Sequence, residues 1–267
     1  MGFIIVLHVI FFAMCGVTST EPLLSRNTYK GLKGIVPSAE ISTTGLRRAV
    51  YYHDQAVAVI DVNGRNEIQN CDIIEVYEPE EQMEVLANLS DIARPTEVSF
   101  SDMTGLMYRC QTVDRMKDDI SGDKNQAKSS VDPVNVFSGN PFYLLFGIVP
   151  GTKWCGTGDI AQDYQDLGPN SAVDRCCRTH DLCPVKVRAH RTRYNITNSS
   201  AYSKSHCDCD HAFYNCLKSV GTSTANIMGK IYFNIVKVGC VEDLPKSVNL
   251  KLSTNQMRRF ASAKLSF

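Results

Sequence analysis

Clustered cysteines constrain the fold of this 267-residue chain more strongly than any other feature. Six of the eleven cysteines lie between Trp154 and Asp210, a stretch that also holds the only tryptophan and a Gly-x-Gly loop. In its middle, the pair His180-Asp181 stands between cysteines. Disulfides hold together modules whose hydrophobic core is too small to do so alone, so this stretch is expected to be a rigid, cross-linked module.

Residues 1–20 have the composition of a secretory signal peptide. Phe3–Ala13 is almost entirely apolar but too short to span a bilayer as a helix, and cleavage is expected near Ser19. Its removal takes away Cys15 and leaves ten cysteines, an even number that predicts five disulfides in an oxidising compartment. We therefore expect a secreted, extracellular protein. Three sequences would accept N-linked glycans in such a protein: Asn88-Leu-Ser, Asn195-Ile-Thr and Asn198-Ser-Ser.

Charge divides the remaining chain into two halves. Glu21–Gly147 carries 12 lysines and arginines against 19 acidic residues, and Ile148–Phe267 carries 16 against 9, which gives −7 and +7. A basic unit favours anionic surfaces such as membranes or nucleic acid, whereas two oppositely charged halves can also associate with each other. The two interpretations are compatible, and composition does not decide between them.

A small α+β unit is predicted in the acidic half, from Ala49 to Cys110. Ala56–Val62 is rich in β-branched residues, which indicates a strand, and Asn63-Gly64 is a hairpin turn signal. Pro79–Leu89 has apolar residues at helical spacing, and Ser99–Val113 is predicted as a second helix.

The cysteines and the composition of this half indicate where it ends. Cys71 and Cys110 are the only cysteines of the unit, so the simplest hypothesis is that they pair. Asp118–Pro141 is rich in Ser, Asp, Lys, Asn and Gly, which is typical of a linker. The predicted organisation is a signal peptide at 1–20, an amino-terminal extension or pro-region at 21–117, a linker at 118–147 and a domain at 148–267.

Two helices are predicted to carry the reactive side chains of the module. Val173–Val187 holds His180 and Asp181, and His206–Ser219 holds Asp210. Neighbouring side chains on a helix diverge by about 100°, so Asp181 cannot orient the His180 ring. Asp210 on the second helix is the candidate for that role.

Asp181 is then left to face the Gly-x-Gly loop. Gly156 and Gly158 let a loop turn its carbonyl oxygens inward without steric cost. Calcium takes about six to eight oxygen ligands, commonly backbone carbonyls together with a carboxylate. The loop and Asp181 therefore predict a calcium site beside the histidine.

Five motifs follow one another along the module: Trp154-Cys-Gly-Thr-Gly158, Cys176-Cys-Arg-Thr-His-Asp-Leu-Cys183, Cys207-Asp-Cys-Asp210, Phe213-Tyr-Asn-Cys-Leu-Lys218 and Gly229-Lys-Ile-Tyr-Phe-Asn234. Their combination and order resemble the secreted phospholipase A2 of the bee-venom type (group III). The resemblance covers about Ile148–Cys240. The Ala49–Cys110 region is similar to the amino-terminal extension of longer arthropod members.

The resemblance implies a mainly α, disulfide-rich fold, in which two antiparallel helices carry the catalytic pair beside a calcium-binding loop and a small α+β unit precedes them. It implies four disulfides in the module: Cys155–Cys177, Cys176–Cys216, Cys183–Cys209 and Cys207–Cys240. A further pair of the family has no counterpart, because no cysteine follows Cys240. The fold of the tail after Val241 is therefore left open.

The resemblance also assigns roles to individual residues. It makes His180 the general base, which Asp210 orients and beside which Tyr232 lies. For Ca²⁺ it implies the backbone carbonyls of Trp154, Gly156 and Gly158 and the carboxylate of Asp181. The implied activity is calcium-dependent hydrolysis of the sn-2 ester of glycerophospholipids to a free fatty acid and a lysophospholipid. The implied partner is a phospholipid membrane surface, and no nucleic acid partner is expected.

Three alternatives are weaker. A zinc site built from His180, Cys183, Cys207 and Cys209 is disfavoured, because secretion favours disulfides over thiolates. A receptor ligand or membrane-perturbing toxin without turnover would not need the histidine and its two aspartates, which are present. A plain disulfide-linked binding module leaves the glycine loop unexplained. Tyr232 could still be a core aromatic.

The acidic half, Glu21–Gly147, is predicted to be a regulatory segment or pro-segment. Ile148-Val-Pro-Gly-Thr-Lys-Trp154 is similar to the mature start of the family, so the active form is expected to begin near Ile148. The acidic segment is expected to mask a basic surface that would otherwise meet anionic lipid. Such masking is electrostatic and weakens with salt, over a Debye length of about 8–10 Å.

Overall fold

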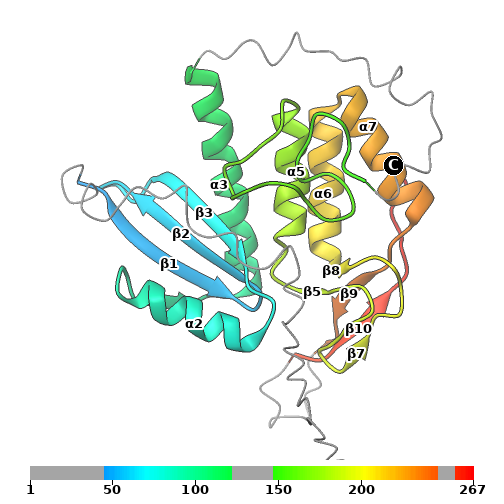
Figure 1. Ribbon diagram of the computed structural model, residues 1–267, viewed down its shortest axis with the longest axis horizontal. Helices are drawn as coiled ribbons and strands as arrows, with labels where there is room; N and C mark the ends of the chain where they lie inside the picture. Colours follow the sequence, from blue (N-terminus) through cyan, green and yellow to red (C-terminus); the bar gives the residue numbers. More distant parts are fainter. Residues whose placement is uncertain (1–44, 122–146, 246–255) are drawn as a thin grey trace, which may run out of the picture.

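The computed structural model describes residues 45–121, 147–245 and 256–267 (Figure 1). Residues 45–121 are called the amino-terminal unit below, and 147–245 with 256–267 are called the module. The predicted signal peptide and most of the predicted linker lie outside the described residues. No helix within these ranges is long and apolar enough to cross a membrane.

A four-stranded sheet forms the centre of the amino-terminal unit. Strands β1 (Arg47–His53), β2 (Ala56–Val62) and β3 (Ile68–Glu75) form an antiparallel meander, and the short β4 (Pro95–Glu97) pairs in parallel with β1. The predicted strand at Ala56–Val62 is confirmed, and all seven of its residues are buried. The predicted hairpin turn joins it to β3.

Alternation along β2 divides its side chains between two cores. Val57 packs with α2 (Pro79–Ser90) on one face of the sheet. Ala58 points to the other face and belongs to the larger core, which includes α3 (Phe100–Ser121). Successive side chains of a strand point to opposite faces, so one strand can serve both cores. Both helices predicted for this unit are confirmed.

Helix α3 is longer than predicted. It continues past the predicted end at Val113 as far as Ser121, which lies inside the range predicted as linker. Asp114 supplies a reason, since its carboxylate forms a buried ion pair with Arg178 of the module. This ion pair holds the polar helical turn around Asp114 against the module. The local composition could not indicate this contact.

The module is built around α5 (Ser171–Asp181) and α6 (Cys207–Val220), which pack side by side (Figure 1). The predicted helix Val173–Val187 is wrong at its end, because α5 stops sooner and Lys186–Val187 forms strand β5 instead. Pro184 accounts for the difference, since proline disfavours helical backbone in the residue before it and lacks an N–H donor.

Short two-stranded sheets and further helical turns complete the module. The sheets pair β5 with β8 (Lys204–Ser205), β6 (Thr192–Arg193) with β7 (Ile196–Thr197), and β9 (Cys240–Asp243) with β10 (Arg258–Ala261). Helix α7 (Ser223–Gly229) leads directly into a π-helix, η3 (Lys230–Val236). The module is therefore disulfide-rich, with both helices and small sheets.

The ten cysteines of the described residues pair as predicted. The bonds are Cys71–Cys110, Cys155–Cys177, Cys176–Cys216, Cys183–Cys209 and Cys207–Cys240. None of these bonds joins the amino-terminal unit to the module. Within the described residues, the two parts are therefore held together by non-covalent contacts.

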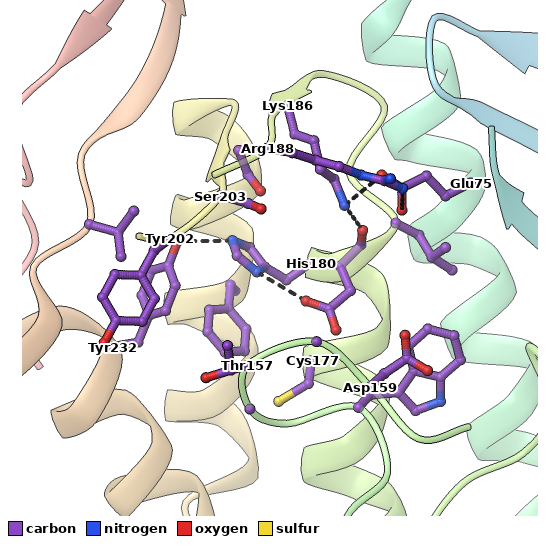
Figure 2. Close-up of a pocket in the computed structure, with 18 of the residues that line it drawn as sticks. Glu75, Thr157, Asp159, Cys177, His180, Lys186, Arg188, Tyr202, Ser203 and Tyr232 are labelled. Atoms are coloured by element: carbon purple, nitrogen blue, oxygen red, sulfur yellow. Dashed lines mark hydrogen bonds and ion pairs between the residues drawn. The ribbon is translucent and has the colours of Figure 1, made fainter. Parts of the chain in front are cut away.

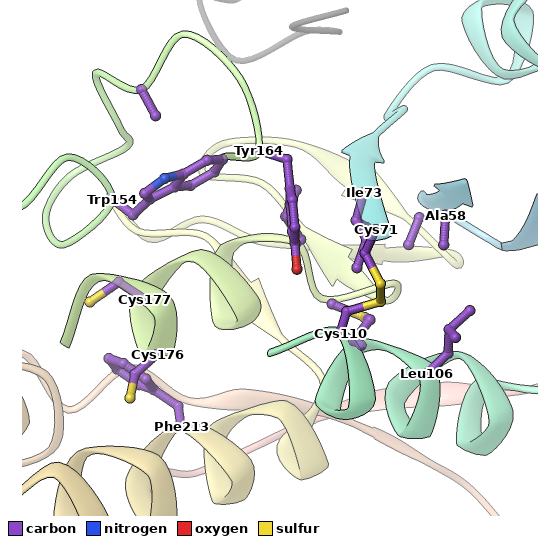
Figure 3. Close-up of a cluster of buried hydrophobic side chains, with 14 of the residues drawn as sticks. Ala58, Cys71, Ile73, Leu106, Cys110, Trp154, Tyr164, Cys176, Cys177 and Phe213 are labelled. Carbon is purple, nitrogen blue, oxygen red and sulfur yellow. A yellow bond between two sulfur atoms is a disulfide. The ribbon is translucent and has the colours of Figure 1, made fainter. Parts of the chain in front are cut away.

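The two parts share one hydrophobic core. Ile73 of the sheet and Leu106 of α3 belong to the same buried cluster as Trp154 and Tyr164 of the module. Figure 3 shows Tyr164 between Trp154 on one side and Ile73 on the other. The acidic half therefore packs on the basic half as part of one folded body.

Ion pairs reinforce this contact, with acidic side chains from the amino-terminal unit and basic side chains from the module. They join Glu75 to Lys186 and Arg188, Asp54 to Arg193 and Arg258, and Asp114 to Arg178. Association of the two halves within one chain, one of the two interpretations of the charge pattern, is therefore observed.

The end of the chain returns to the module although it carries no cysteine. Strand β10 pairs with β9, and Phe267 stacks on Phe233. A Cβ on Gly229 would clash with the Phe267 ring, so glycine makes room for it. The Asn234 side chain donates a hydrogen bond from Nδ2 to the Phe267 carbonyl at 3.0 Å and accepts one at Oδ1 from the Phe267 N–H at 2.8 Å.

Candidate active site

The glycine loop is folded back on the start of the module. A β-bridge at Gly156 is closed by the Val149 N–H, which donates to the Cys155 carbonyl at 2.7 Å. A Cβ on Gly156 would clash with the Gly147 carbonyl oxygen. Gly158 has a φ of +80°, in the left-handed region. Glycine is therefore required at both positions.

Asp174, which the sequence analysis missed, ties this loop to α5. Its carboxylate is fully buried and accepts backbone N–H bonds from Lys153 at 2.9 Å, from Trp154 at 2.7 Å and from Gly168 at 2.7 Å. An acid in the first turn of a helix is ordinarily explained by the helix dipole, so its sequence signal was weak. The loop and His180 are thus positioned by the same helix.

His180 and Asp210 meet across the two helices. His180 Nε2 lies 2.8 Å from Asp210 Oδ1. His180 Nδ1 lies 3.9 Å from Asp181 Oδ1, which is too far for a hydrogen bond. The imidazole also stacks on Phe213, with ring centroids 4.6 Å apart. Asp210 therefore holds the ring through one nitrogen, and the other nitrogen faces the side of Asp181.

Tyr232 reaches the same carboxylate from η3. Its hydroxyl donates to Asp210 Oδ1 at 3.0 Å and lies 3.3 Å from His180 Nε2. Burial, followed by the nearby Asp210 charge, raises the pKa of Tyr232 well above its usual value. The phenol therefore remains protonated and able to donate. π-Helical turns are rare and often occur at functional sites.

Most of the predicted site residues line one cavity, with a volume of about 360 Å³ (Figure 2). Those on its wall are Trp154, Gly156, Gly158, His180, Asp181 and Tyr232. Asp210 is buried behind the histidine. The wall also contains four charged side chains that were not predicted to belong to the site: Glu75, Asp159, Lys186 and Arg188. No motif of the module could indicate Glu75, because it belongs to the other half of the chain.

The donor groups beside the histidine fit a hard cation. In the part of the chain that the structure describes, no three His, Cys, Asp or Glu side chains gather in a way that could bind a metal ion. A cation would therefore need backbone oxygens, and Trp154, Gly156 and Gly158, whose carbonyls are the predicted ligands, line the same cavity as Asp181. Carbonyl and carboxylate oxygens are the ligands that calcium takes.

The alternative zinc site is wrong. The disulfides Cys183–Cys209 and Cys207–Cys240 occupy all three sulfur atoms on which it depended. A sulfur atom in a disulfide is no longer a thiolate and cannot serve as a zinc ligand.

Comparison with known proteins identifies the family of this chain. A family model described as phospholipase A2 matches residues 148–244. The phospholipase A2 of Apis cerana cerana is 40% identical over 94 residues, which are 35% of this chain and 70% of that protein. This chain belongs to the phospholipase A2 family, in its bee-venom type. The acidic phospholipase A2 PA4 of Heloderma suspectum is 42% identical over 95 residues, which are 36% of this chain and 67% of that protein. The Apis mellifera phospholipase A2 is 42% identical over 94 residues, which are 35% of this chain and 56% of that protein.

Membership of the phospholipase A2 family establishes the enzyme class. The protein is a phospholipase A2, a hydrolase of lipid metabolism, rather than a ligand without turnover or a plain binding module. The matched range contains His180, Asp210, Tyr232 and the glycine loop, whereas the amino-terminal unit lies outside it.

Proposed function

We propose that the protein is a secreted, calcium-dependent phospholipase A2 that hydrolyses the sn-2 ester of glycerophospholipids to a free fatty acid and a lysophospholipid. One observation carries the proposal. His180 is bonded to Asp210 at 2.8 Å and shares a cavity with the oxygen-rich glycine loop. This shared cavity supports the proposal, because metal-assisted ester hydrolysis requires a base and hard oxygen donors around one space.

His180 is the general base in this proposal. Asp210 accepts the hydrogen bond from Nε2–H, which leaves the lone pair on Nδ1 directed toward the cavity. From there it takes a proton from the water that attacks the ester carbonyl, and later returns that proton to the leaving alkoxide. The Tyr232 hydroxyl donates to the same Asp210 oxygen and limits rotation of the carboxylate.

The metal role is assigned to the backbone carbonyls of Trp154, Gly156 and Gly158 and to the carboxylate of Asp181. Bound Ca²⁺ would polarise the ester carbonyl and stabilise the oxyanion. The chain holds these groups in place through Asp174, which bonds to the loop, and through Cys155–Cys177, which links the loop to α5. Such rigidity keeps the donors in position for the cation and for the ester.

Fatty acid release from phosphatidylcholine vesicles tests the calcium requirement. Turnover is expected with calcium and is expected to stop with excess chelator. Asp181→Asn is expected to weaken calcium binding and turnover together, about tenfold or more, because one anionic ligand oxygen is lost. Calcium binding can be followed through the fluorescence of Trp154, the only tryptophan. Equal rates with calcium and with chelator would contradict the proposal.

The lipid surface is the proposed partner of the cavity mouth. Ile160 and Ile235 are 64% and 63% exposed. Ile160 directly follows Asp159 and Ile235 directly precedes Val236, and both of these neighbours line the cavity. Large apolar side chains at this exposure are candidates for burial in lipid. We propose that these two side chains contact the membrane while the substrate enters the cavity.

We also propose that the amino-terminal unit masks part of the basic surface. Its carboxylates already pair with module cations, as Asp54 does with Arg193 at 2.8 Å and with Arg258 at 3.2 Å. Asp54→Asn is therefore expected to raise binding to anionic vesicles at low salt but not binding to zwitterionic vesicles. Unchanged binding to both would favour a passive extension instead. That the active form begins near Ile148 remains a prediction.

A further inference from the structure

A charged cluster lies in the wall of the active-site cavity, and one of its members comes from the amino-terminal unit. Glu75, at the end of β3, contacts Lys186 Nζ at 3.0 Å and an Arg188 guanidinium nitrogen at 3.1 Å. The side chains of Glu75, Lys186 and Arg188 are only 11%, 8% and 17% exposed. The cluster is therefore part of the cavity wall and not of the outer surface. Figure 2 shows it on one side of His180, with Tyr232 on the other.

The two cations are held in place by the protein around them. The Lys186 ammonium also donates to the Asp181 carbonyl, at the end of α5. The Arg188 guanidinium lies over the Tyr77 ring, 4.2 Å from its centroid. Both cations belong to the matched phospholipase range, whereas the carboxylate between them does not. Partly desolvated charges interact more strongly than exposed ones, so Glu75 has a large effect on this wall.

The position of Glu75 resembles that of an anionic ligand. A carboxylate between an ammonium and a guanidinium receives charge-assisted hydrogen bonds, as the carboxylate of a serine headgroup would. While Glu75 occupies this position, such a headgroup gains little from the two cations. A choline headgroup carries no carboxylate and therefore cannot form these hydrogen bonds with Lys186 and Arg188.

We propose that Glu75 is a specificity-determining residue, which pairs with Lys186 and Arg188, offsets one of their two positive charges and so disfavours phospholipids whose headgroup carries an additional carboxylate. This inference rests on the proposed phospholipase function. It also gives the amino-terminal unit a part in substrate choice within the cavity, separate from any masking of the outer surface.

The test compares hydrolysis of two short-chain substrates, dihexanoyl-phosphatidylserine and dihexanoyl-phosphatidylcholine, both kept monomeric in solution. Monomers remove the contribution of surface binding, so the ratio of kcat/KM values reports on the cavity alone. Glu75→Gln in the full chain is expected to raise the serine-to-choline ratio about fivefold, because two partly buried cations lose their carboxylate. Glu97→Gln is the matched control, since Glu97 is exposed on β4 of the same unit, and should leave the ratio unchanged.

Arg188→Gln provides the second variant. In the Glu75→Gln background it should return the ratio to near the wild-type value, and alone it should lower the ratio. If Glu75→Gln does not fold, as judged by its thermal midpoint, the single Arg188→Gln variant decides. An unchanged ratio in either single variant, or a gain that survives in the double variant, would overturn the proposal. Absence of turnover on both substrates in the wild type would instead contradict the proposed function.

Discussion

One hydrogen bond decides how His180 can act. Its Nε2 is held 2.8 Å from Asp210 Oδ1, and the Tyr232 hydroxyl donates to that same oxygen at 3.0 Å. The side chains of His180 and Asp210 are 10% and 8% exposed, so water competes weakly for this bond. In the proposed mechanism, Nδ1 is then the ring nitrogen that accepts a proton from water.

His180→Gln is expected to lower turnover by a factor of about 10² to 10⁴, the usual contribution of a general base. Calcium affinity should remain within about twofold, because His180 is not among the proposed ligands. Fatty acid release and calcium titration on the same preparation check both expectations, with the thermal midpoint as a control for folding. Turnover near the wild-type level would show that another group removes the proton.

At the scale of elements, the start of α6 depends on His206. The His206 imidazole Nδ1 accepts a hydrogen bond from Asp208 N–H at 3.2 Å and so caps the helix that carries Asp210. Phe100 of α3 covers the ring, with centroids 4.3 Å apart. Asp243 faces its other nitrogen at 3.7 Å. The helix cap is therefore buried in the contact between the two parts of the protein.

This cap predicts a loss of stability on acidification. Burial lowers the pKa of His206, opposed by the nearby charges of Asp208 and Asp243. Because the folded pKa lies below the unfolded value of about 6.5, the stabilisation is fully present above pH 6.5 and is lost as pH falls through the folded pKa. The urea midpoint should therefore fall between about pH 7 and pH 5.

His206→Asn tests this expectation, because asparagine caps a helix without titrating in this range. The variant should show a smaller fall of the urea midpoint over the same pH interval. His211→Asn, on the exposed face of the same helix, is the control and should behave as the wild type does. Identical pH slopes in the wild type and in His206→Asn would rule out the proposed contribution of this cap.

At the scale of the whole molecule, the two halves form one folded body without a covalent bond between their described parts. Arg178 is fully buried on α5, where it bonds to the Asp114 carboxylate and lies 3.7 Å from the Tyr164 ring centroid. Its only carboxylate partner in the described ion pairs thus comes from the amino-terminal unit. Arg178 lies two residues before His180. A form beginning at Ile148 would lack Asp114 and would leave this buried cation without its carboxylate partner.

Asp114→Ala is therefore expected to lower the free energy of unfolding by about 3–5 kcal/mol, because it leaves a buried charge unpaired. Arg115→Ala, at an exposed neighbouring position of α3, should change it by less than about 0.5 kcal/mol. Urea denaturation of the full chain measures both. A loss below about 1 kcal/mol in Asp114→Ala would show that the amino-terminal unit contributes little to the stability of α5.

Several local features could be predicted from the sequence because neighbouring residues carry them. Gly156 is required by the close approach of the loop backbone, and its motif identifies it without knowledge of the fold. Adjacent helical side chains diverge, so Asp181 could be separated from the orienting role, in agreement with its 3.9 Å distance from the His180 ring. The β2 strand was predicted from its own β-branched residues, whereas the four disulfides of the module were predicted from the resemblance to the family.

Only the tertiary structure revealed the polar contacts between the two halves of the chain and those of Asp174. Asp114 extends α3 because Arg178 lies beside it, and Glu75 enters the cavity wall because β3 packs against the module. The buried role of Asp174 likewise depends on a loop some twenty residues before it. Local sequence determined which chemical groups this protein has, because motifs and spacing are local. Packing determined their partners, because burial and charge pairing depend on distances that only the folded chain establishes.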